Sequence, residues 1–321
     1  MNYSFEEFNK KAEKNFLKEY INIKHVTLNP SQKKRYMGGV LNKICRYCNK
    51  NEKSTTFKKV AHAIPFLIGN RTLIDNLECD KCNEHFGRKI EDSFANYFHP
   101  YRLMNSIRGR KRLKYNSSGL DITTDQDRGL NVSVSPNDEQ EEPAFVRVSE
   151  DLIKFTLERP AYYPVAIYKT FVKIALALMP ESEKVKTIIL NDWLLSNEQV
   201  PLIKEQKVIQ WKVRGPSDPD TIRCTLYKAK PEFEDTNIRY VLIFAFSSFQ
   251  FQVPIPSINN GNPNIAMPLA PSLRPIEEYK EFGNPSIDVI DFSSNAIVRN
   301  EKVEIFFRIE ESQIKDASSS L

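Results

Sequence analysis

The chain has 321 residues, of which 40% are hydrophobic, and a formal net charge of +5. This length allows about two domains, and the apolar content is enough for globular cores. No apolar run approaches the roughly 18 residues that span a bilayer, and the first residues lack the basic and apolar parts of a signal peptide. These features exclude a membrane protein and favour a cytoplasmic, globular one.

Positive charge is concentrated in the N-terminal third of the chain. Residues 1–115 contain 24 Lys and Arg against 11 Asp and Glu, whereas the remaining residues contain 22 against 30. A basic region is suited to approach phosphate groups, although lysine-rich faces are often only solvated.

An amphipathic helix is predicted from Ser4 to about Ile21. Ser4 and Glu7 form a capping box, and one ridge of the helix is apolar, with Phe5, Phe8, Ala12, Phe16 and Tyr20. We expect this helix to cover the cysteine-rich region that follows it. The segment Lys33-Lys34-Arg35 comes after Pro30 and is predicted to be a loop that can touch a nucleic-acid backbone.

Two Cys-x-x-Cys pairs stand at Cys45/Cys48 and Cys79/Cys82. Four thiolates in two close pairs are the donor set that tetrahedral Zn²⁺ requires, and they leave no coordination position open for chemistry. The sequence therefore predicts a structural zinc site in a reducing compartment rather than disulfides. The fifth cysteine, Cys224, lies in a predicted strand and is expected to be a small buried apolar side chain.

Thirty residues separate Cys48 from Cys79, more than the roughly 15 to 20 of a plain zinc ribbon. We predict a strand over residues 55–60, turn residues at 68–71, and a helix that begins at Asp80 and stops at His99-Pro100. We call each Cys-x-x-Cys pair a knuckle. The order is thus the first knuckle, a hairpin bearing His62, a loop, the second knuckle and a helix bearing Asn83.

In this order the segment resembles the HNH, or ββα-metal, endonucleases, in the subclass with two Cys-x-x-Cys pairs. The resemblance covers residues 45 to about 90 and includes Ile64-Pro65 after the histidine and Phe86-Gly87 after the last cysteine. It implies that His62 is the general base, that Asn76 in the loop fixes the hairpin, and that Asn83 binds a catalytic Mg²⁺ or Mn²⁺.

One position departs from the family pattern. Many members carry Asp or Glu directly before the histidine as a second metal ligand, and this chain has Ala61. Asp80, Glu84 and His85 lie close to Asn83 in the sequence and are alternatives for the missing ligand. A single neutral ligand would hold the ion weakly, so we expect the ion to arrive together with the substrate.

A dense basic run follows the predicted helix and includes Arg108, Arg110, Lys111 and Arg112. It is either a phosphate-binding arm next to the active site or an exposed linker without a partner. Nothing in it reads base sequence, so its contacts would position a nucleic acid without specifying it.

From about residue 116 the pattern changes to short strands around one strongly apolar helix. Strands are predicted near residues 120–122, 130–134, 144–148, 208–213, 222–227, 238–246, 249–253, 287–292 and 303–309. The helix runs from Pro164 to Met179, and its Lys169 and Lys173 are expected to reach solvent rather than bind an anion. The strand at 249–253 is expected to be half exposed, the turn at 136–143 acidic, and the segment from Pro254 to Pro275 a long surface loop.

The sequence therefore predicts an α+β protein in two parts. Residues 1–115 would form a zinc-stapled ββα-metal nuclease domain, and residues 116–321 a larger α+β domain for regulation, target recognition or oligomerisation. The predicted activity is hydrolysis of phosphodiester bonds in nucleic acid, foremost double-stranded DNA, and the resemblance suggests bacterial antiphage defence or restriction. The alternatives are an effector nuclease triggered by a ligand or a partner protein, and a non-catalytic zinc module that only binds nucleic acid.

Overall fold

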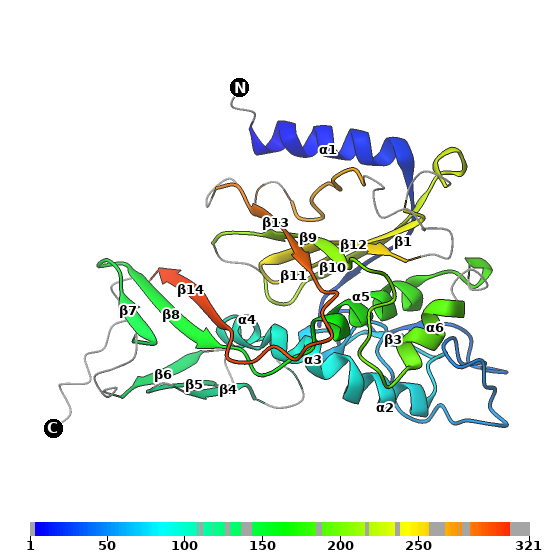
Figure 1. The fold of residues 1–321 in the computed structure, drawn as a ribbon, viewed down its shortest axis with the longest axis horizontal. Coiled ribbons are helices and arrows are strands. Elements are labelled where there is room, and N and C mark those ends of the chain that lie inside the picture. The colour runs from blue at the N-terminus through cyan, green and yellow to red at the C-terminus, as the bar shows by residue number, and fades with distance from the viewer. Residues whose placement is uncertain are drawn as a thin grey trace.

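A computed structural model describes residues 4–107, 109, 112–117, 119–125, 129–135, 143–183, 188–215, 218–234, 238–256, 267–275, 277 and 283–308. The fold is mixed α+β, as predicted, and a six-stranded sheet lies at its centre (Figure 1). The strands of this sheet are all antiparallel and run in the order β1 (Tyr20–Leu28), β10 (Ile222–Ala229), β11 (Tyr240–Phe246), β12 (Phe249–Ile255), β9 (Lys207–Lys212) and β13 (Ser286–Asp291).

Helices cover both faces of the central sheet. Helix α1 (Phe5–Glu19) lies on one face, and α5 (Pro164–Leu178) lies on the other with α6 (Ile188–Leu195) beside it (Figure 1). Strand β11 is buried throughout: Leu242 and Phe244 join the core on the α5 side, whereas Val241 and Ile243 join the core on the α1 side. Alternate residues of a strand point to opposite faces, so the doubly apolar pattern of this strand reflects a sheet covered twice.

The capping box of α1 is confirmed, since the Glu7 amide donates to Ser4 Oγ and the Ser4 amide donates to the Glu7 carboxylate. The expected partner of this helix was wrong. Phe16 contacts Tyr227 of β10 with ring centroids 5.0 Å apart, and Phe5 contacts Trp211 of β9 at 6.0 Å. The ridge therefore covers the central sheet on the face opposite α5, because β1 carries the chain directly into that sheet.

The cysteine-rich region contains only short elements. These are β2 (Arg35–Met37), the 3₁₀-helix η1 (Phe66–Ile68), β3 (Leu73–Asp75), α2 (Asp80–Lys89), α3 (Glu91–Tyr97) and α4 (His99–Met104). The single helix predicted after Asp80 is thus three helices, broken at Ile90 and Phe98, and Pro100 stands in the first turn of the last one. Proline lacks an amide proton that a first turn would leave unpaired, so it starts this helix instead of ending one.

Two three-stranded sheets complete the fold. One contains β4 (Lys114–Ser117), β5 (Leu120–Thr124) and β6 (Leu130–Val134), and the other contains β7 (Phe145–Arg147), β8 (Leu152–Glu158) and β14 (Lys302–Arg308). A short 3₁₀-helix, η3 (Pro231–Phe233), follows β10. Strand β8 was not predicted from the sequence. The acidic turn at 136–143 lies, apart from Pro143, outside the described residues.

Strand β12 is buried on both faces, so the half-exposed strand predicted there was wrong. The side chains of Gln250 and Gln252 are fully buried and bond to the backbone of the following segment. Gln252 accepts from the Ala270 amide at 2.8 Å and donates to the Pro268 carbonyl at 2.8 Å. The predicted surface loop from Pro254 to Pro275 therefore includes, at 267–275, a stretch that packs on the sheet, since amide side chains can pair with backbone groups.

The two parts predicted from the sequence share one sheet and one core. Strand β1 belongs to the first part and β10 to the second, and their eight register partners begin with Tyr20 opposite Ala229. The main apolar cluster likewise contains Phe86 and Phe94 together with Phe171 and Phe244. The boundary at residue 115 stays a prediction, and the sheet crosses it. Within the described residues, no helix has the length and apolar character needed to cross a membrane.

Candidate functional site

The four paired cysteines form one cluster. Their Sγ atoms all lie within 4.8 Å of one another, and Cys45 to Cys82 and Cys48 to Cys79 are each separated by 3.7 Å. A tetrahedral ion with Zn–S bonds of about 2.3 Å holds its sulfurs about 3.8 Å apart, whereas a disulfide needs about 2.05 Å. The donor set therefore fits a structural zinc ion, which would clamp the start of α2 to the 45–48 knuckle.

The hairpin that bears the candidate base is shorter than predicted and lies later in the sequence. Residues 55–60 form no strand; pairing begins where the Asp75 amide donates to the Ala61 carbonyl at 2.9 Å, continues through a bridge between His62 and Ile74, and ends with Ala63 to Leu73. The preceding segment instead turns its amides toward a carboxylate. The backbone amides of Lys58 and Lys59 donate to the Asp80 carboxylate at 3.2 and 2.8 Å. This carboxylate thus takes the place of the carbonyl acceptors that a partner strand would offer.

Asn70 closes the hairpin loop. Its Nδ2 donates to the carbonyls of Ile64 and Leu73 at 2.7 and 2.9 Å, and its Oδ1 accepts from the amides of Thr72 and Leu73 at 3.0 and 2.8 Å. The side chain is fully buried, so these four bonds replace water entirely. Sequence reasoning missed this residue, although the Gly69-Asn70 turn signal pointed to it.

Asn76, to which the sequence assigned the fixing role, makes different contacts. Its amide N donates to the Met37 carbonyl at 2.9 Å, and its Nδ2 lies 3.4 Å from the Gly38 carbonyl. It therefore connects the hairpin to the end of β2. Whether it contributes to catalysis stays a prediction.

His62 lies on an open face of a small three-stranded arrangement. Ile74 is the bridge partner of His62 and also the register partner of Tyr36 in the parallel β2–β3 pair. Residues directly opposite each other across a sheet point to the same face, so the three side chains form one row. Within this row Tyr36 is exposed, His62 is half-buried and Ile74 between them is buried, so the imidazole is accessible at one end of the row.

The His62 ring is half-buried and rests edge-on against Phe66, with centroids 5.1 Å apart. The Arg71 guanidinium stacks on the same phenyl ring at 3.7 Å. These contacts restrict the rotation of the imidazole without enclosing it.

Asn83 lies in helix α2, directly after the last cysteine of the cluster. Asp80, three residues earlier and therefore on the same helix face, accepts from Thr56 Oγ1 at 2.5 Å and from the two lysine amides. Burial opposes ionisation of this carboxyl, but these hydrogen bonds outweigh it and lower the pKa of Asp80. Asp80 is thus a charged cap that fixes α2 against residues 56–59.

The three neighbours of Asn83 that were alternatives for a metal ligand all have other partners. Asp80 makes the bonds just described, Glu84 forms an ion pair with Lys59, and His85 Nε2 lies 3.0 Å from the Leu194 carbonyl. Burial lowers the pKa of His85 and outweighs that contact. Binding of a catalytic ion by Asn83 stays a prediction.

A buried lysine from α5 supports the backbone of the candidate base. Lys173 Nζ donates to the His62 carbonyl at 3.2 Å, and it pairs with Glu91 at 2.7 Å and Glu78 at 3.2 Å. Its side chain is 1% exposed, so the prediction that it reaches solvent was wrong. Lys169 is also buried and donates to the Glu198 carbonyl at 2.8 Å. Helix α5 is enclosed on all sides, so neither lysine has a route to water.

The charges in this cluster are shared between one lysine and two carboxylates. Burial alone would lower the pKa of Lys173, but Glu78 and Glu91 reverse this and raise it. Burial raises the pKa of Glu78 to about 8 against the attraction of Lys173. Lys173 is therefore charged and paired chiefly with the less buried Glu91, and Glu78 keeps a proton near neutral pH.

A second buried pair joins the first knuckle to the hairpin. Arg46 Nε lies 2.7 Å from the Asp75 carboxylate, and its Nη1 donates to the Leu176 carbonyl of α5 at 3.0 Å. Asn191 of α6 donates to the Arg46 carbonyl at 3.0 Å. Both α5 and α6 thus contact the region around the cysteines.

Of the predicted basic arm, Arg108, Arg110 and Lys111 lie outside the described residues. Arg112 is described and is exposed directly before β4. Its predicted contact with nucleic acid stays a prediction.

The segment thus combines a short hairpin that bears His62, a four-sulfur cluster that fits a structural zinc ion, and the start of helix α2. Residues 45–99 match the family model described as HNH endonuclease. The match assigns this segment to the HNH endonucleases, a class of enzymes that acts on nucleic acid. No curated protein and no solved structure matches the chain.

Proposed function

We propose that this chain is a metal-dependent nuclease that hydrolyses phosphodiester bonds, with double-stranded DNA as the first substrate to test and bacterial antiphage defence or restriction as its setting. The observation that carries the proposal is the accessible His62 in the family-matched segment, with its backbone held on two sides. One side is the hairpin closed by Asn70, and the other is the Lys173 ammonium. Such fixing favours catalysis because a base acts only at the correct position.

His62 is the proposed general base. A neutral imidazole can accept a proton from water, and histidine is the side chain generally suited to this role close to neutral pH. The half-exposed ring allows a water molecule and a phosphodiester to approach it. The Phe66 contact keeps the ring directed to the open face.

Asn83 is the proposed ligand of Mg²⁺ or Mn²⁺. A divalent ion bound there would neutralise charge on the phosphoryl oxygens and on the departing alkoxide. Within the described part of the chain, the four cysteines are the only group of three or more His, Cys, Asp or Glu side chains close enough together to hold an ion. The Asn83 amide therefore needs oxygens from water and substrate to complete the ligand set, as the sequence suggested.

The test is a cleavage assay on duplex DNA, single-stranded DNA and RNA with Mg²⁺ or Mn²⁺. We expect the wild-type chain to cleave at least one substrate, and His62→Ala and Asn83→Ala each to lower the rate by at least about 100-fold, the usual size of a general-base contribution. The matched control is His25→Ala, because His25 lies on β1 with hydroxyl partners and outside the site. Equal loss in the control, or full activity of His62→Ala, would refute the assignment.

The absence of cleavage in every sample would have a different meaning. It would favour the effector nuclease that needs a ligand or a partner protein bound by residues 116–321, and the same assay would then be repeated with lysate from phage-infected cells. Nucleic-acid binding without cleavage under any of these conditions would favour the non-catalytic zinc module.

A further inference from the structure

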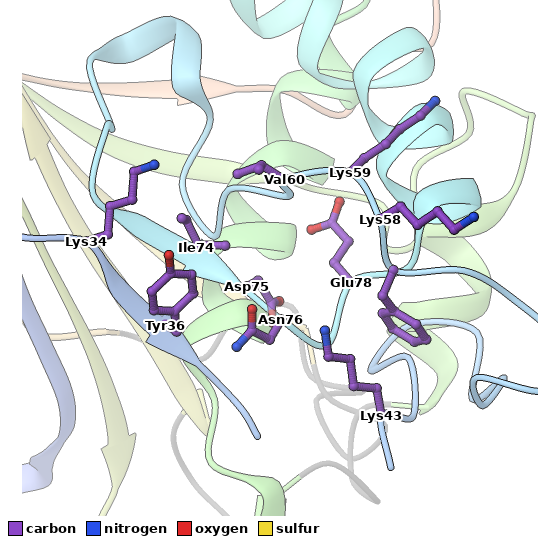
Figure 2. A pocket seen from close by; sticks show the side chains of 11 residues that line it. Lys34, Tyr36, Lys43, Lys58, Lys59, Val60, Ile74, Asp75, Asn76 and Glu78 are labelled. Carbon is purple, nitrogen blue, oxygen red and sulfur yellow. The ribbon is translucent and has the colours of Figure 1, made fainter. Parts of the chain in front are cut away.

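A pocket of about 160 Å³ opens beside β2 and the end of the hairpin (Figure 2). Its lining includes Lys34, Tyr36, Lys43, Lys58, Lys59 and Asn76. Three of these residues, 34, 36 and 43, precede the family-matched segment, which begins at residue 45. The pocket is therefore a feature of this chain that the family match does not assign.

The pocket lies on the same face as the His62 ring. Tyr36, Ile74 and His62 form the row described above, and Lys34, Asn76 and Val60 follow at two-residue steps on the same three segments. Tyr36 and Ile74 line the pocket and also belong to the row that ends at His62, so the pocket and the imidazole are parts of one surface. Two strand spacings, about 10 Å, separate the Tyr36 and His62 backbones.

The electrostatic balance of the pocket is positive. Two carboxyl groups contribute to its lining, but Asp75 is paired with Arg46, and Glu78 is buried beside Lys173. Lys59 pairs with Glu84, whereas within the described residues no carboxylate forms an ion pair with Lys34, Lys43 or Lys58. Three ammonium groups thus remain available to an anion.

One lysine is directed into the pocket, whereas Lys34 stands beside Tyr36 on the opposite side with its ammonium turned away from Lys43 (Figure 2). Figure 2 shows Lys43 directed toward the middle, near Asn76, whereas Lys58 and Lys59 point outward at the rim. The Lys43 ammonium lies 5.6 Å from the centroid of the Phe57 ring, which holds the chain in this direction. Tyr36, with 59% of its surface exposed, adds a hydroxyl donor and an aromatic ring at the entrance.

The size of the pocket limits the ligand. Pockets that enclose drug-sized ligands have volumes of about 300–1,000 Å³, so this one would hold a single group such as a phosphate and not a whole nucleotide. Backbone phosphates of nucleic acids are bound mainly by Lys, Arg and Tyr or Asn donors, and this pocket offers three of those four types.

We propose that this pocket is a subsite for a backbone phosphate of the nucleic-acid substrate, bound by Lys34, Lys43 and Tyr36. With about 3.4 Å of helix axis per nucleotide of one strand, the bound phosphate would lie within about three nucleotides of the bond that His62 attacks. The proposal rests on the proposed nuclease function for its ligand, and it adds where the substrate strand runs beside the scissile bond.

The experiment measures binding separately from cleavage. Full-length His62→Ala protein is titrated with a labelled 20-nucleotide duplex and with single-stranded DNA and RNA of the same length, without divalent ions, at several salt concentrations. Lys34→Gln/Lys43→Gln is added to that background, and Lys11→Gln/Lys14→Gln is the matched control. The control lysines are exposed on α1, beyond the central sheet, and they remove the same charge.

We expect the pocket variant to weaken binding at least 10-fold and to reduce the slope of log affinity against log salt by about 1 to 2, since each lost phosphate contact removes about 0.9 on duplex DNA. The control should change the slope by less than half as much. Tyr36→Phe should weaken binding without changing the slope, because it removes a hydrogen-bond donor but no charge. Among the duplex, the single-stranded DNA and the RNA, the one whose binding the pocket variant weakens most is the nucleic acid that the pocket binds.

The subsite would be overturned if the pocket variant had the same salt slope as the His62→Ala protein. It would also be overturned if Lys11→Gln/Lys14→Gln reduced the slope as much as the pocket variant does, because only the net charge would then matter. Either result would leave the nuclease proposal intact if wild-type protein cleaves. Conversely, a pocket-specific loss of slope together with failure of wild type to cleave would support the subsite and would favour the triggered effector nuclease or the non-catalytic zinc module.

Discussion

At the scale of single residues, two asparagines stabilise the hairpin through different contacts. Asn70 makes four buried hydrogen bonds across the loop, whereas Asn76 makes two contacts toward the end of β2. Removing a buried partner leaves backbone groups unsatisfied at about 1–3 kcal/mol each. Asn70→Ala should therefore lower the free energy of unfolding by at least about 2 kcal/mol, and Asn76→Ala by less than about 1 kcal/mol.

Urea unfolding of both variants measures this difference. If Asn76→Ala were the more damaging of the two, the loop would be held as the family resemblance implies and not as the contacts indicate. Activity adds a second comparison. Asn76→Ala has little reason to unfold the chain, so a large loss of rate in that variant would indicate a role nearer to the reaction.

The buried Lys169 predicts a dependence of stability on pH. Burial lowers its pKa to about 8, against a weaker opposing effect of Glu198, so the folded chain binds this proton less tightly than the unfolded chain, where the value is near 10.5. Between these two values the unfolded state holds more protons, and the contribution of this lysine to stability therefore rises with pH from about 8 to 10.5. Below pH 8 the full cost of the buried charge is present.

Lys169→Met should accordingly raise the free energy of unfolding at pH 7 by about 1–2 kcal/mol, since the charging cost of at most about 3 kcal/mol is partly offset by the hydrogen bond lost to Glu198. The gain should shrink as the pH rises toward 10.5. Thermal unfolding of the variant and of Lys14→Met, an exposed control, tests this across pH 7 to 10.5. A gain that is constant with pH would mean that the pKa of Lys169 is the same in the folded and in the unfolded chain, so that burial does not lower it.

At the scale of elements, α5 connects the candidate site to the central sheet. Its Lys173 contacts the His62 carbonyl, Glu91 of α3 and Glu78, and it is fully enclosed. Removing one member of a buried ion cluster leaves the others uncompensated, at a cost of about 3–5 kcal/mol. Lys173→Met should therefore lower the free energy of unfolding by about that amount.

Denaturant unfolding measures this loss, and a double variant checks its cause. Because Glu91 is the closer partner, Lys173→Met with Glu91→Gln should recover part of the stability that Lys173→Met loses. Lys173→Met alone with wild-type stability would contradict the cluster. A double variant no better than the single one would show that the lost bond to His62, not the unpaired charge, carries the cost.

How far the sequence predicts these elements depends on how local their causes are. The capping box at Ser4, the cysteine pairs and the ends of α5 follow from residues close together in the chain, and the structure has each of them. The partners of Lys173, Gln250 and Asn70 lie across the fold or within a loop closed by side-chain bonds. No periodicity signals such contacts, so a buried lysine was taken for a solvated one.

At the scale of the whole molecule, the nuclease segment depends on residues far beyond its family match. Strand β1 pairs along its length with β10, the first knuckle is bonded to α5 and α6, and the main core joins α2 and α3 to the sheet. A fragment of residues 1–115 would expose the edge of β1 that pairs with β10 in the full chain, and it would expose one whole side of that core. Unpaired edges and large apolar surfaces promote aggregation.

We therefore expect the 1–115 fragment, produced with zinc, to be aggregated or to lack cooperative unfolding, whereas the full-length chain should unfold in one transition. Circular dichroism and size exclusion on both proteins test this, and the matched control is a 30–115 fragment, which lacks α1 and β1 but keeps the four cysteines. If 30–115 folds and cleaves while 1–115 aggregates, the exposed β1 causes the aggregation, and the cysteine-rich region folds on its own. A monomeric, cooperatively folded 1–115 fragment would instead support a domain boundary at residue 115, and the contacts across it would then be docking between two units rather than a shared core.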